Sequence, residues 1–478
     1  MSPGAAAGGR TTPRAVALEA LGRIGREDFS IEAAVDRAGI DSLGEADRGL
    51  AFELVHGVVR NRAWLDAAIG QKARRDAESL TPVVRDILGM ALYQVEFLDR
   101  VPDHAAVFEA VDLAKRRAPR GSDRLVNAVL RAFLRDRTVS LPDRERDPVG
   151  WLAVLYSHPA WMVRRWVGRL GPEETERLLK ANNARPPLVL RANRLRTTRE
   201  ALLSRLAESG IPFRPGAYSP DAVILDKGGA RPDRLPGWGE GLFTVQDEGA
   251  QMISLLVDPQ PGERILDACA APGGKALHLA ALMGNKGEIA AADPSAERLS
   301  LVREAASRLG AGIVTPVESD AVGLAGVFSE SAFDRILVDA PCSGTGVLRR
   351  HPEGKWRKEE GMIGEFSALQ RKILSAVAPL LKTGGRLVFA TCSLEPEEGE
   401  KAARWVGGNL RGLVLVNVSS ILPAGLPAGA RAMTTPEGFL RTWPHRHGTD
   451  GFFAAVWEKR EASLSGAHSG RGLGDQGR

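Results

Sequence analysis

Residues 263–284 read ERILDACAAPGGKALHLAALMG, and this stretch decides the fold of the C-terminal half of the chain. A short apolar run ends at Asp267, a loop with two adjacent glycines follows, and apolar residues then recur at the spacing of a helix. Further short apolar runs alternate with helical stretches downstream; they are GEIAAADP, GIVTPVES, FDRILVDAP and GRLVFATCS. This alternation predicts a doubly wound, mostly parallel α/β sheet over residues 246–460, which the segments LVLVNV and GFFAAVWEK are expected to close as a terminal pair.

Two further regions precede this sheet. Residues 12–138 repeat apolar side chains at three- and four-residue spacing in several segments, which predicts a compact all-α bundle. Residues 139–245 mix helical stretches with strand-like runs such as PLVLRANRL, which predicts a small α+β module. The ends, 1–11 and 461–478, are rich in glycine and serine with few apolar anchors, and we expect them to be disordered.

Composition narrows the class of protein. The 478 residues carry a formal net charge of +5, which permits a nucleic-acid partner without demanding one. Three cysteines, far apart in sequence, make neither a disulfide framework nor a zinc site, and they favour a reducing compartment. There is no signal-peptide pattern and no apolar run of about 18 residues. We therefore expect a cytoplasmic protein that does not enter a membrane, and nothing in the sequence demands more than a monomer.

The glycine loop is the first candidate binding site, because ligands of open α/β sheets lie beyond the carboxyl ends of the strands. Its glycines allow close approach to the backbone, and the helix that follows offers free N–H groups. The dinucleotide pattern GxGxxG and the phosphate-binding Walker pattern are both absent, which disfavours those ligands. A plain glycine turn is the alternative. The candidate ligand-binding residues are Cys269, Ala270, Ala271, Pro272, Gly273, Gly274 and Lys275.

Two acids follow the next two strands. Asp293 stands about 20 residues after the glycine loop, where an acid commonly binds ribose hydroxyls; a helix N-cap is the alternative. Asp320 follows the third apolar run and suits an adenine amino group, or merely a turn. Their placement after successive strands outlines one adenosine-shaped pocket.

Two cysteines follow the fourth and fifth strands. Cys342 lies in DAPCSGTG and Cys392 in ATCS, so both are expected on the same rim of the sheet. A lone buried cysteine is usually a small hydrophobe, but two thiols at one crevice favour chemistry. Cys269 is assigned a packing role or a backbone contact to a cofactor.

A ribose pocket beside two thiols suits one reaction in particular. A thiolate adds readily to C6 of a pyrimidine, and C5 then attacks an electrophilic methyl group. Asp339, at the end of the fourth strand, is placed to act near N3 of the base. S-adenosylmethionine supplies both an adenosine and a methyl group. The spacing alone does not say which thiol is the nucleophile.

The segment GVLRRHPEGKWRK follows the Cys342 loop and interleaves basic residues with an aromatic one. That mixture suits phosphate contact and base stacking, and a solvated charged loop is the alternative. The candidate RNA-binding residues are Arg349, Arg350, His351, Lys355 and Trp356. A later segment, RTWPHRHGTDGFF, contains histidines without a cysteine or paired acid, so no metal site is predicted.

The motifs DACAAPGGK, DAPCSGTGVLRRHPEGKW and ATCSLEPEE resemble those of the Sun-type family of RNA cytosine-C5 methyltransferases. The segment LDRVPDHAAVFEAVDLAKRRAPRGSDRLVNAVLR is similar to a NusB-type RNA-binding domain, and the resemblance covers about residues 12–460. It implies a Rossmann-like class I methyltransferase domain with a seven-stranded sheet. It also implies an S-adenosylmethionine site made by Asp293, Asp320, Asp339 and the glycine loop, with Cys392 as nucleophile and Cys342 assisting product release.

The same resemblance implies a partner, 16S ribosomal RNA, free or in a partly assembled small subunit. Transfer RNA as substrate and a non-catalytic ribosomal-RNA-binding assembly factor remain alternatives. DNA cytosine methyltransferases, which carry their nucleophile in a proline-cysteine loop, are a rival for the order of the thiols. The sequence departs from the family pattern at Gly399, Ala276 and Gly354, where asparagine, threonine and a bulkier residue are common.

Overall fold

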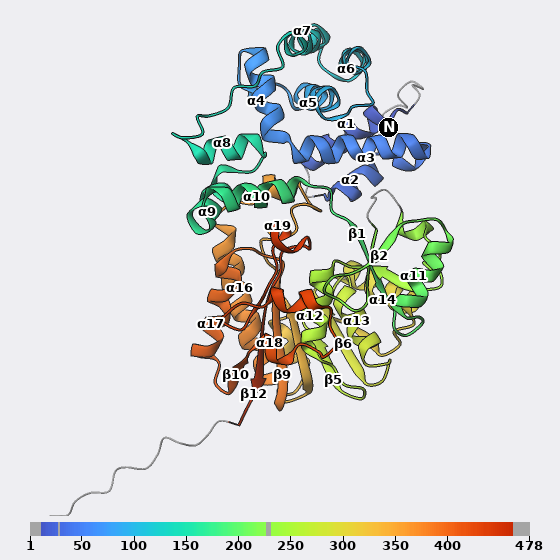
Figure 1. Ribbon diagram of the computed structural model, residues 1–478, viewed down its shortest axis with the longest axis vertical. Coiled ribbons are helices and arrows are strands. Elements are labelled where there is room, and N and C mark those ends of the chain that lie inside the picture. The colour runs from blue at the N-terminus through green and yellow to red at the C-terminus, as the bar shows by residue number, and fades with distance from the viewer. Residues whose placement is uncertain (1–10, 27–28, 226–230, 462–478) are drawn as a thin grey trace, which may run out of the picture.

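The computed structural model describes residues 11–26, 29–225 and 231–461. The two end segments predicted to be disordered lie outside the described residues, except for residues 11 and 461. A helical domain stacks on a larger α/β domain, with a middle region between them and along one side (Figure 1). None of the described helices is long and apolar enough to cross a membrane.

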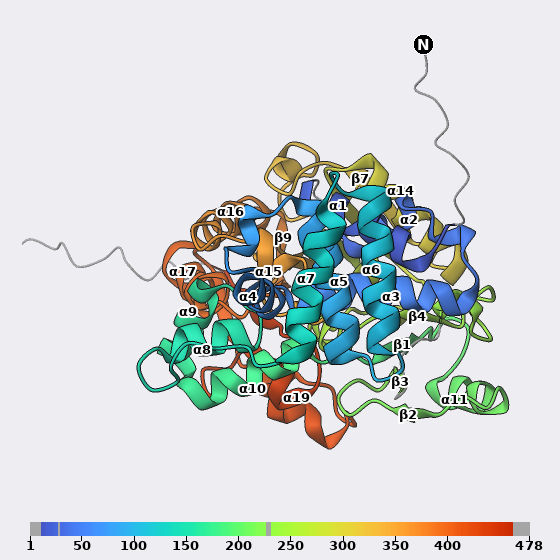
Figure 2. The same cartoon turned by 90° about the horizontal axis from the view of Figure 1, so that it is seen from above.

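The N-terminal domain is the predicted all-α bundle. Its helices are α1 (Pro13–Arg26), α2 (Ile31–Arg37), α3 (Glu45–Arg60), α4 (Arg62–Ala73), α5 (Pro82–Phe97), α6 (Asp103–Arg117) and α7 (Ser122–Arg135). Helix α5 is buried along most of its length and lies among the others (Figure 2). Helix α7 turns Val126, Val129, Leu130 and Phe133 inward, which is the spacing of a single helical face.

The middle region, predicted as a small α+β module over residues 139–245, contains both helices and strands, and these pack in two places. The helices α8 (Pro148–Leu155), α9 (Ala160–Leu170) and α10 (Pro172–Asn183) share a core with Leu348, Leu394 and Trp443 of the α/β domain. A separate four-stranded sheet in the order β2-β3-β1-β4 then packs against helix α11. Its elements are β1 (Leu188–Ala192), α11 (Arg199–Glu208), β2 (Phe213–Pro215), β3 (Ala222–Leu225) and β4 (Phe243–Val245). The division was not visible in the sequence, because the apolar partners of the helices lie more than 150 residues away along the chain.

The C-terminal domain is the predicted doubly wound sheet, with strand order β10-β12-β9-β8-β5-β6-β7 and a short β11 paired to β12. Strands β5 to β9 run parallel, and β12 lies antiparallel between β9 and β10, so the predicted terminal pair is confirmed. The strands are β5 (Arg264–Asp267), β6 (Glu288–Asp293), β7 (Val314–Glu318), β8 (Phe333–Asp339), β9 (Leu381–Thr391), β10 (Leu413–Val416), β11 (Leu440–Arg441) and β12 (Phe453–Lys459).

Helices cover both faces of this sheet. Helices α12 (Glu248–Val257), α13 (Gly274–Leu282) and α14 (Ala296–Leu309) bury their apolar residues on one face. Helices α16 (Met362–Val377) and α17 (Glu400–Asn409) cover the other. Short helices α15 (Gly354–Arg357), α18 (Val418–Ile421) and α19 (Pro444–His447) lie in the connecting segments.

The order of the strands fixes where a ligand can bind. The chain runs from β5 outward through β6 to β7, then returns to the other side of β5 for β8 and β9. The carboxyl ends of β5, β6, β8 and β9 therefore meet around a topological switch point, the usual binding crevice of such a sheet. The three cysteines, Asp293 and Asp339 stand at these ends, and Asp320 follows β7 at the edge of the sheet.

Candidate active site

The glycine loop links β5 to α13 in a tight turn. Gly273 N–H donates to the carbonyl of Ala270 at 2.7 Å, and Ala270 N–H donates to Ala292 of β6 at 2.8 Å. Gly273 has φ +102°, and a Cβ there would lie 3.3 Å from Val302, so glycine fits both the backbone and the space. Cys269 packs against the buried core, and burial raises the pKa of its thiol well above the ordinary range. That environment matches the packing role expected for it.

Asp267, the last residue of β5, was not proposed as a site residue from the sequence. Its side chain is fully buried, and neither oxygen has a hydrogen-bond partner of ordinary geometry among the described residues. Burial, followed by the charge of Asp339, raises its pKa to about 7, although the nearby backbone of Cys269 and Ala276 opposes the shift. A buried carboxyl without a partner at the switch point can accept or donate a hydrogen bond to a ligand. The signal was an acid directly before the glycine loop.

The two acids after β6 and β7 have local partners. Asp293 is buried and pairs with Arg298 at 3.0 Å, and it also accepts from Ser295 N–H at 3.0 Å. Asp320 is exposed, and its Oδ1 accepts from the backbone N–H groups of Val322 and Gly323, both at 2.8 Å. Asp320 therefore has the turn role that was its alternative, whereas the N-cap of α14 is Ser295 and not Asp293. Ligand contacts by both acids stay a prediction.

The two cysteines of the predicted pair lie side by side. Cys342 Sγ is 3.4 Å from Cys392 Sγ, at the carboxyl ends of the neighbouring strands β8 and β9. The thiol contact lowers the pKa of Cys392, against the effect of burial, and the positive charges of Lys275 and Lys358 lower it further. The same contact, with burial, raises the pKa of Cys342. The ammonium groups of Lys275 and Lys358 favour the thiolate of Cys392, which agrees with the nucleophile role that the family resemblance implies for it.

Asp339 and Lys275 form the polar side of the same crevice. Lys275 Nζ lies 2.5 Å from Asp339 Oδ2, which joins the glycine loop to the end of β8. The charge of Asp339 raises the pKa of Lys275, although burial opposes it as the largest single influence. The pair can donate to, or accept from, the ring of a planar base held at the thiols.

Glu398 ties the two cysteine loops together and was missed from the sequence, where it is one of four acids after ATCS. Its buried carboxylate accepts from Ser343 N–H at 2.7 Å, from the Ser343 hydroxyl, and from Ser393 Oγ at 2.6 Å. Each serine directly follows one of the cysteines. Burial raises the pKa of Glu398, and the hydrogen bonds oppose that effect. Position 399 leaves little room, since a Cβ on Gly399 would lie 2.7 Å from Arg441 Nη2.

The predicted RNA contacts of Arg349 and Arg350 are not where the sequence suggested. Arg349 is buried and donates to Asp450 at 2.5 Å and to Asp247 at 3.1 Å. Arg350 donates to the same acids at 2.6 and 2.8 Å. Both guanidinium groups thus neutralise a pair of buried carboxylates and hold the start of α12 to the loop before β12. The expectation that these arginines bind RNA is corrected to a structural role.

Lys355 and Trp356 require the same correction. Lys355 is 0% exposed and donates to the carbonyls of Arg60 at 3.0 Å and Ser157 at 2.9 Å, and to Asn183 Oδ1 at 2.8 Å. Trp356 Nε1–H donates to the carbonyl of Val59 at 2.8 Å. The carbonyls at the end of α3 need donors, and these side chains supply them. The segment therefore fastens the α/β domain to the two helical regions.

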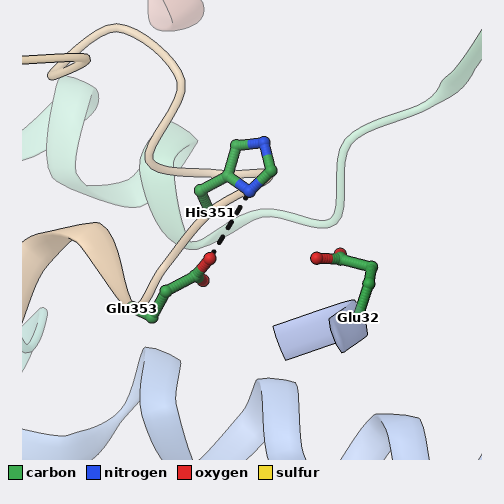
Figure 3. A group of neighbouring side chains, drawn as sticks. All are labelled: Glu32, His351 and Glu353. Carbon is green, nitrogen blue, oxygen red and sulfur yellow. Dashed lines mark ion pairs between the residues drawn. The ribbon is translucent and has the colours of Figure 1, made fainter. Parts of the chain in front are cut away.

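His351 is the one member of the predicted RNA-binding set with a half-exposed side chain. Its Nδ1 lies 3.5 Å from Glu353 Oε1, and Glu32 of α2 faces the same point (Figure 3). The hydrogen bond to Glu353 raises the pKa of His351. The ion pair accounts for the grouping of these three side chains, which links the N-terminal domain to the segment before α15.

The fold and site together define a class of protein. A sheet with seven strands on its main path, with β12 antiparallel between β9 and β10 and a glycine loop after β5, is a methyltransferase domain of the Rossmann-like class I type. Residues 254–458 match the model of the 16S rRNA methyltransferase RsmB/F family. Residues 11–135 match the NusB family, and residues 158–230 match the ferredoxin-like domain of RsmF/B-like methyltransferases.

Relatives of known name agree over nearly the whole chain. A probable ribosomal RNA small subunit methyltransferase B of Bacillus subtilis is 36% identical over 94% of this chain and 99% of its own length. Ribosomal RNA small subunit methyltransferase B of Pseudomonas putida is 36% identical over the same shares. The solved structure of PH0851 superposes with a TM-score of 0.78 and 30% identity, over 94% of this chain and 99% of that one.

The chain therefore belongs to the RsmB/F family of 16S rRNA methyltransferases, and it is an RNA methyltransferase. The resemblance drawn from its cysteine motifs and its NusB-like segment is confirmed.

Proposed function

We propose that the protein transfers a methyl group from S-adenosylmethionine to C5 of a specific cytosine in 16S ribosomal RNA, through a covalent bond between Cys392 and C6 of the base. The observation that carries the proposal is the 3.4 Å contact between Cys342 and Cys392 beside Asp339 and the glycine loop. Two thiols that differ in acidity at a switch point suit an addition followed by an elimination.

The crevice fits the proposed methyl donor. Its adenosine and amino-acid parts would lie along residues 269–275, Asp293, Asp320 and Asp339, at the carboxyl ends of successive strands. The unpartnered carboxyl of Asp267 and the N-terminus of α13 offer polar contacts that the protein itself leaves open. When bound, S-adenosylmethionine supplies an electrophilic methyl group on a sulfonium.

The side chains divide the work as follows. Cys392, as thiolate, adds to C6, and the electron pair of the C5–C6 double bond moves to C5. C5 then takes the methyl group, and the electron pair of the broken carbon–sulfur bond stays on the donor sulfur. A base removes the C5 proton, the double bond re-forms and the bond between C6 and Cys392 breaks. Cys342, adjacent to that bond, is assigned to this release step.

Asp339 and Lys275 are assigned the role of stabilising the charge that develops on the ring during the addition. Electron density that reaches N3 is stabilised by a hydrogen-bond donor. Asp339 can be that donor when it is protonated. When it is not, Lys275, whose Nζ lies 2.5 Å from Asp339 Oδ2, can donate from the same side of the crevice. Either arrangement uses the residues that end β8 and begin α13.

Transfer RNA as substrate, or a non-catalytic assembly factor, are the alternatives. The names of the relatives and the NusB-like domain favour ribosomal RNA. The paired thiols favour catalysis, because an assembly factor would not need them at 3.4 Å.

The test uses purified protein, S-adenosylmethionine labelled in its methyl group, and three RNAs lacking modifications: 16S ribosomal RNA, the assembling small subunit, and bulk transfer RNA. Label is expected in the first or second substrate, at one cytosine located by bisulfite sequencing. Label confined to transfer RNA would show that transfer RNA, and not ribosomal RNA, is the substrate. Cofactor binding without label in any RNA would favour the assembly factor.

A further inference from the structure

Lys358 follows α15 and is the last residue of the segment GVLRRHPEGKWRK, whose basic residues were expected to suit phosphate contact. Its ammonium reaches the thiol site. A Cβ placed on Gly344, in the loop after Cys342, would lie 3.7 Å from Lys358 Nζ and 3.9 Å from Cys392 Sγ. The ammonium and the proposed nucleophile thus flank the same point above that loop.

The side chain reaches this position by folding back over α15. A Cβ on Gly354 would lie 3.3 Å from Lys358 Cε and 3.5 Å from Nζ, so the absence of a side chain at 354 leaves room for the lysine. Gly354 is one of the departures from the family pattern. A side chain at position 354 would have to share this space with Lys358.

Within the part of the chain that the structure describes, Lys358 has no hydrogen-bond or ion-pair partner. The other cations nearby are used: Lys275 pairs with Asp339 at 2.5 Å, and Lys355 donates to three oxygens. The Lys358 side chain is only partly buried and its ammonium has no protein partner, so it is available to an anion that a ligand brings. Cys392 supplies a charge only when ionised.

The substrate of an RNA methyltransferase brings such anions. A base that undergoes chemistry at C5 and C6 must leave its stack and enter the crevice, and the rotation brings the phosphodiesters that flank it to the rim. Phosphate contacts by lysine position a nucleic acid without reading its sequence. A cation beside the nucleophile is well placed for the phosphate next to the flipped nucleotide.

We propose that Lys358 binds a phosphodiester adjacent to the target nucleotide and so holds the flipped cytosine over Cys392. The inference rests on the proposed function and adds a substrate contact to the same site. It also reassigns the RNA contact of the basic segment from Lys355, which is buried, to a lysine three residues further along.

The test compares Lys358→Met and Lys358→Arg with Lys372→Met, which removes one positive charge from an exposed position on α16. The KM for RNA and the formation of a covalent adduct, trapped by Cys342→Ala, are measured over a range of salt concentrations. Lys358→Met should raise the RNA KM by about tenfold. It should also reduce the slope of log KM against log salt concentration by about 0.7 to 0.9, the contribution of one phosphate contact. Arginine should restore both, and Lys372→Met should change neither by as much.

Equal salt dependences for Lys358→Met and Lys372→Met would overturn the proposal. A second result would also overturn it, namely an effect of Lys358→Met on the thiol alone. In that case the pH dependence of Cys392 alkylation by iodoacetamide, measured by mass spectrometry without RNA, would shift while the RNA KM stayed constant. The proposed function fails separately, if the unaltered protein labels no RNA. Far-UV circular dichroism and the unfolding midpoint confirm that each variant is folded.

Discussion

Two regions are rich in buried polar groups: the thiol rim, formed by Cys342, Cys392 and the acids at the neighbouring strand ends, and the domain contact. The two regions differ in how their polar groups are hydrogen-bonded. In the domain contact, formed by residues 349–356, Arg349 pairs with two acids and Lys355 with three oxygens of its own chain. At the rim, neither side-chain oxygen of Asp267 has a hydrogen-bond partner of ordinary geometry among the described residues, and the thiols share one weak contact. The full pairing of Arg349 and Lys355 suits groups that hold the fold, and the open carboxyl of Asp267 and the weakly held thiols suit groups that meet a ligand.

The cysteines give the sharpest test of the rim. Cys392→Ala should lower methyl transfer by about 10⁴-fold or more and abolish any protein–RNA adduct, because it removes the nucleophile. Cys342→Ala should also halt turnover, but with an adduct that survives denaturing electrophoresis. Ser375→Ala, at an exposed position of α16 outside the crevice, is the control and should retain the reaction. The opposite behaviour of Cys342→Ala and Cys392→Ala would reverse their roles.

Glu398 offers an intermediate case, since it is fully paired yet lies within the rim. Glu398→Ala leaves the Ser343 and Ser393 donors without their acceptor, so the two cysteine loops should separate. A displacement of about 1 Å in a reacting group costs about 10²-fold in rate, and we expect a loss of that size in kcat. Glu398→Gln, which keeps an acceptor oxygen, should recover part of it.

The measurement is single-turnover methyl transfer, with Glu365→Gln on the exposed face of α16 as control. The rate of disulfide formation between Cys342 and Cys392 under glutathione disulfide reports the spacing of the sulfurs without RNA. Unchanged disulfide and transfer rates in Glu398→Ala would show that the carboxylate does not set that spacing.

The sequence predicted the rim better than the domain contact for a physical reason. Strand ends are local features, and the parallel topology brings them to one edge, so Cys342, Cys392 and Asp339 could be placed together from alternation alone. Lys355 and Trp356 donate to the carbonyls of Val59, Arg60 and Ser157, which lie about 200 to 300 residues away along the chain, and no local pattern encodes that docking. Basic residues beside an aromatic look the same whether they face RNA or another domain.

Two residues show how little the sequence says about the role of an individual acid. Glu398 was hidden among neighbouring acids, because only the folded loops reveal which carboxylate meets both serines. Asp267 stood directly before the glycine loop, where its burial without a partner could have been anticipated from the apolar strand that precedes it.

Lys355 tests the claim that the domain contact is structural. Lys355→Met should leave several buried oxygens without a donor and lower the free energy of unfolding by about 1–3 kcal/mol, measured in urea. The salt dependence of RNA binding should match that of the unaltered protein, because the ammonium does not reach solvent. A flattened salt dependence with unchanged stability would restore the original assignment of Lys355 to RNA.

His351 predicts the smallest effect, at the edge of the domain contact. Its pKa is raised by Glu353, so its stabilising charge is fully present below its unfolded pKa and is lost as the pH rises through the folded pKa. Burial lowers the pKa of the neighbouring His56 to about 4, so its contribution is lost only as the pH falls below about 6.5. Above that pH, His56 is neutral in both states and the two effects separate.

The corresponding experiment is the unfolding free energy of His351→Gln and the unaltered protein between about pH 6.5 and 8.5. The unaltered protein should be more stable at the acidic end and lose that advantage as the pH rises. The His351 side chain is 52% exposed, so the difference should stay below about 1 kcal/mol. Glu353→Gln should remove the same pH dependence, because it removes the charge that raises the pKa. A pH dependence that persists in both variants would place its origin elsewhere in the domain contact.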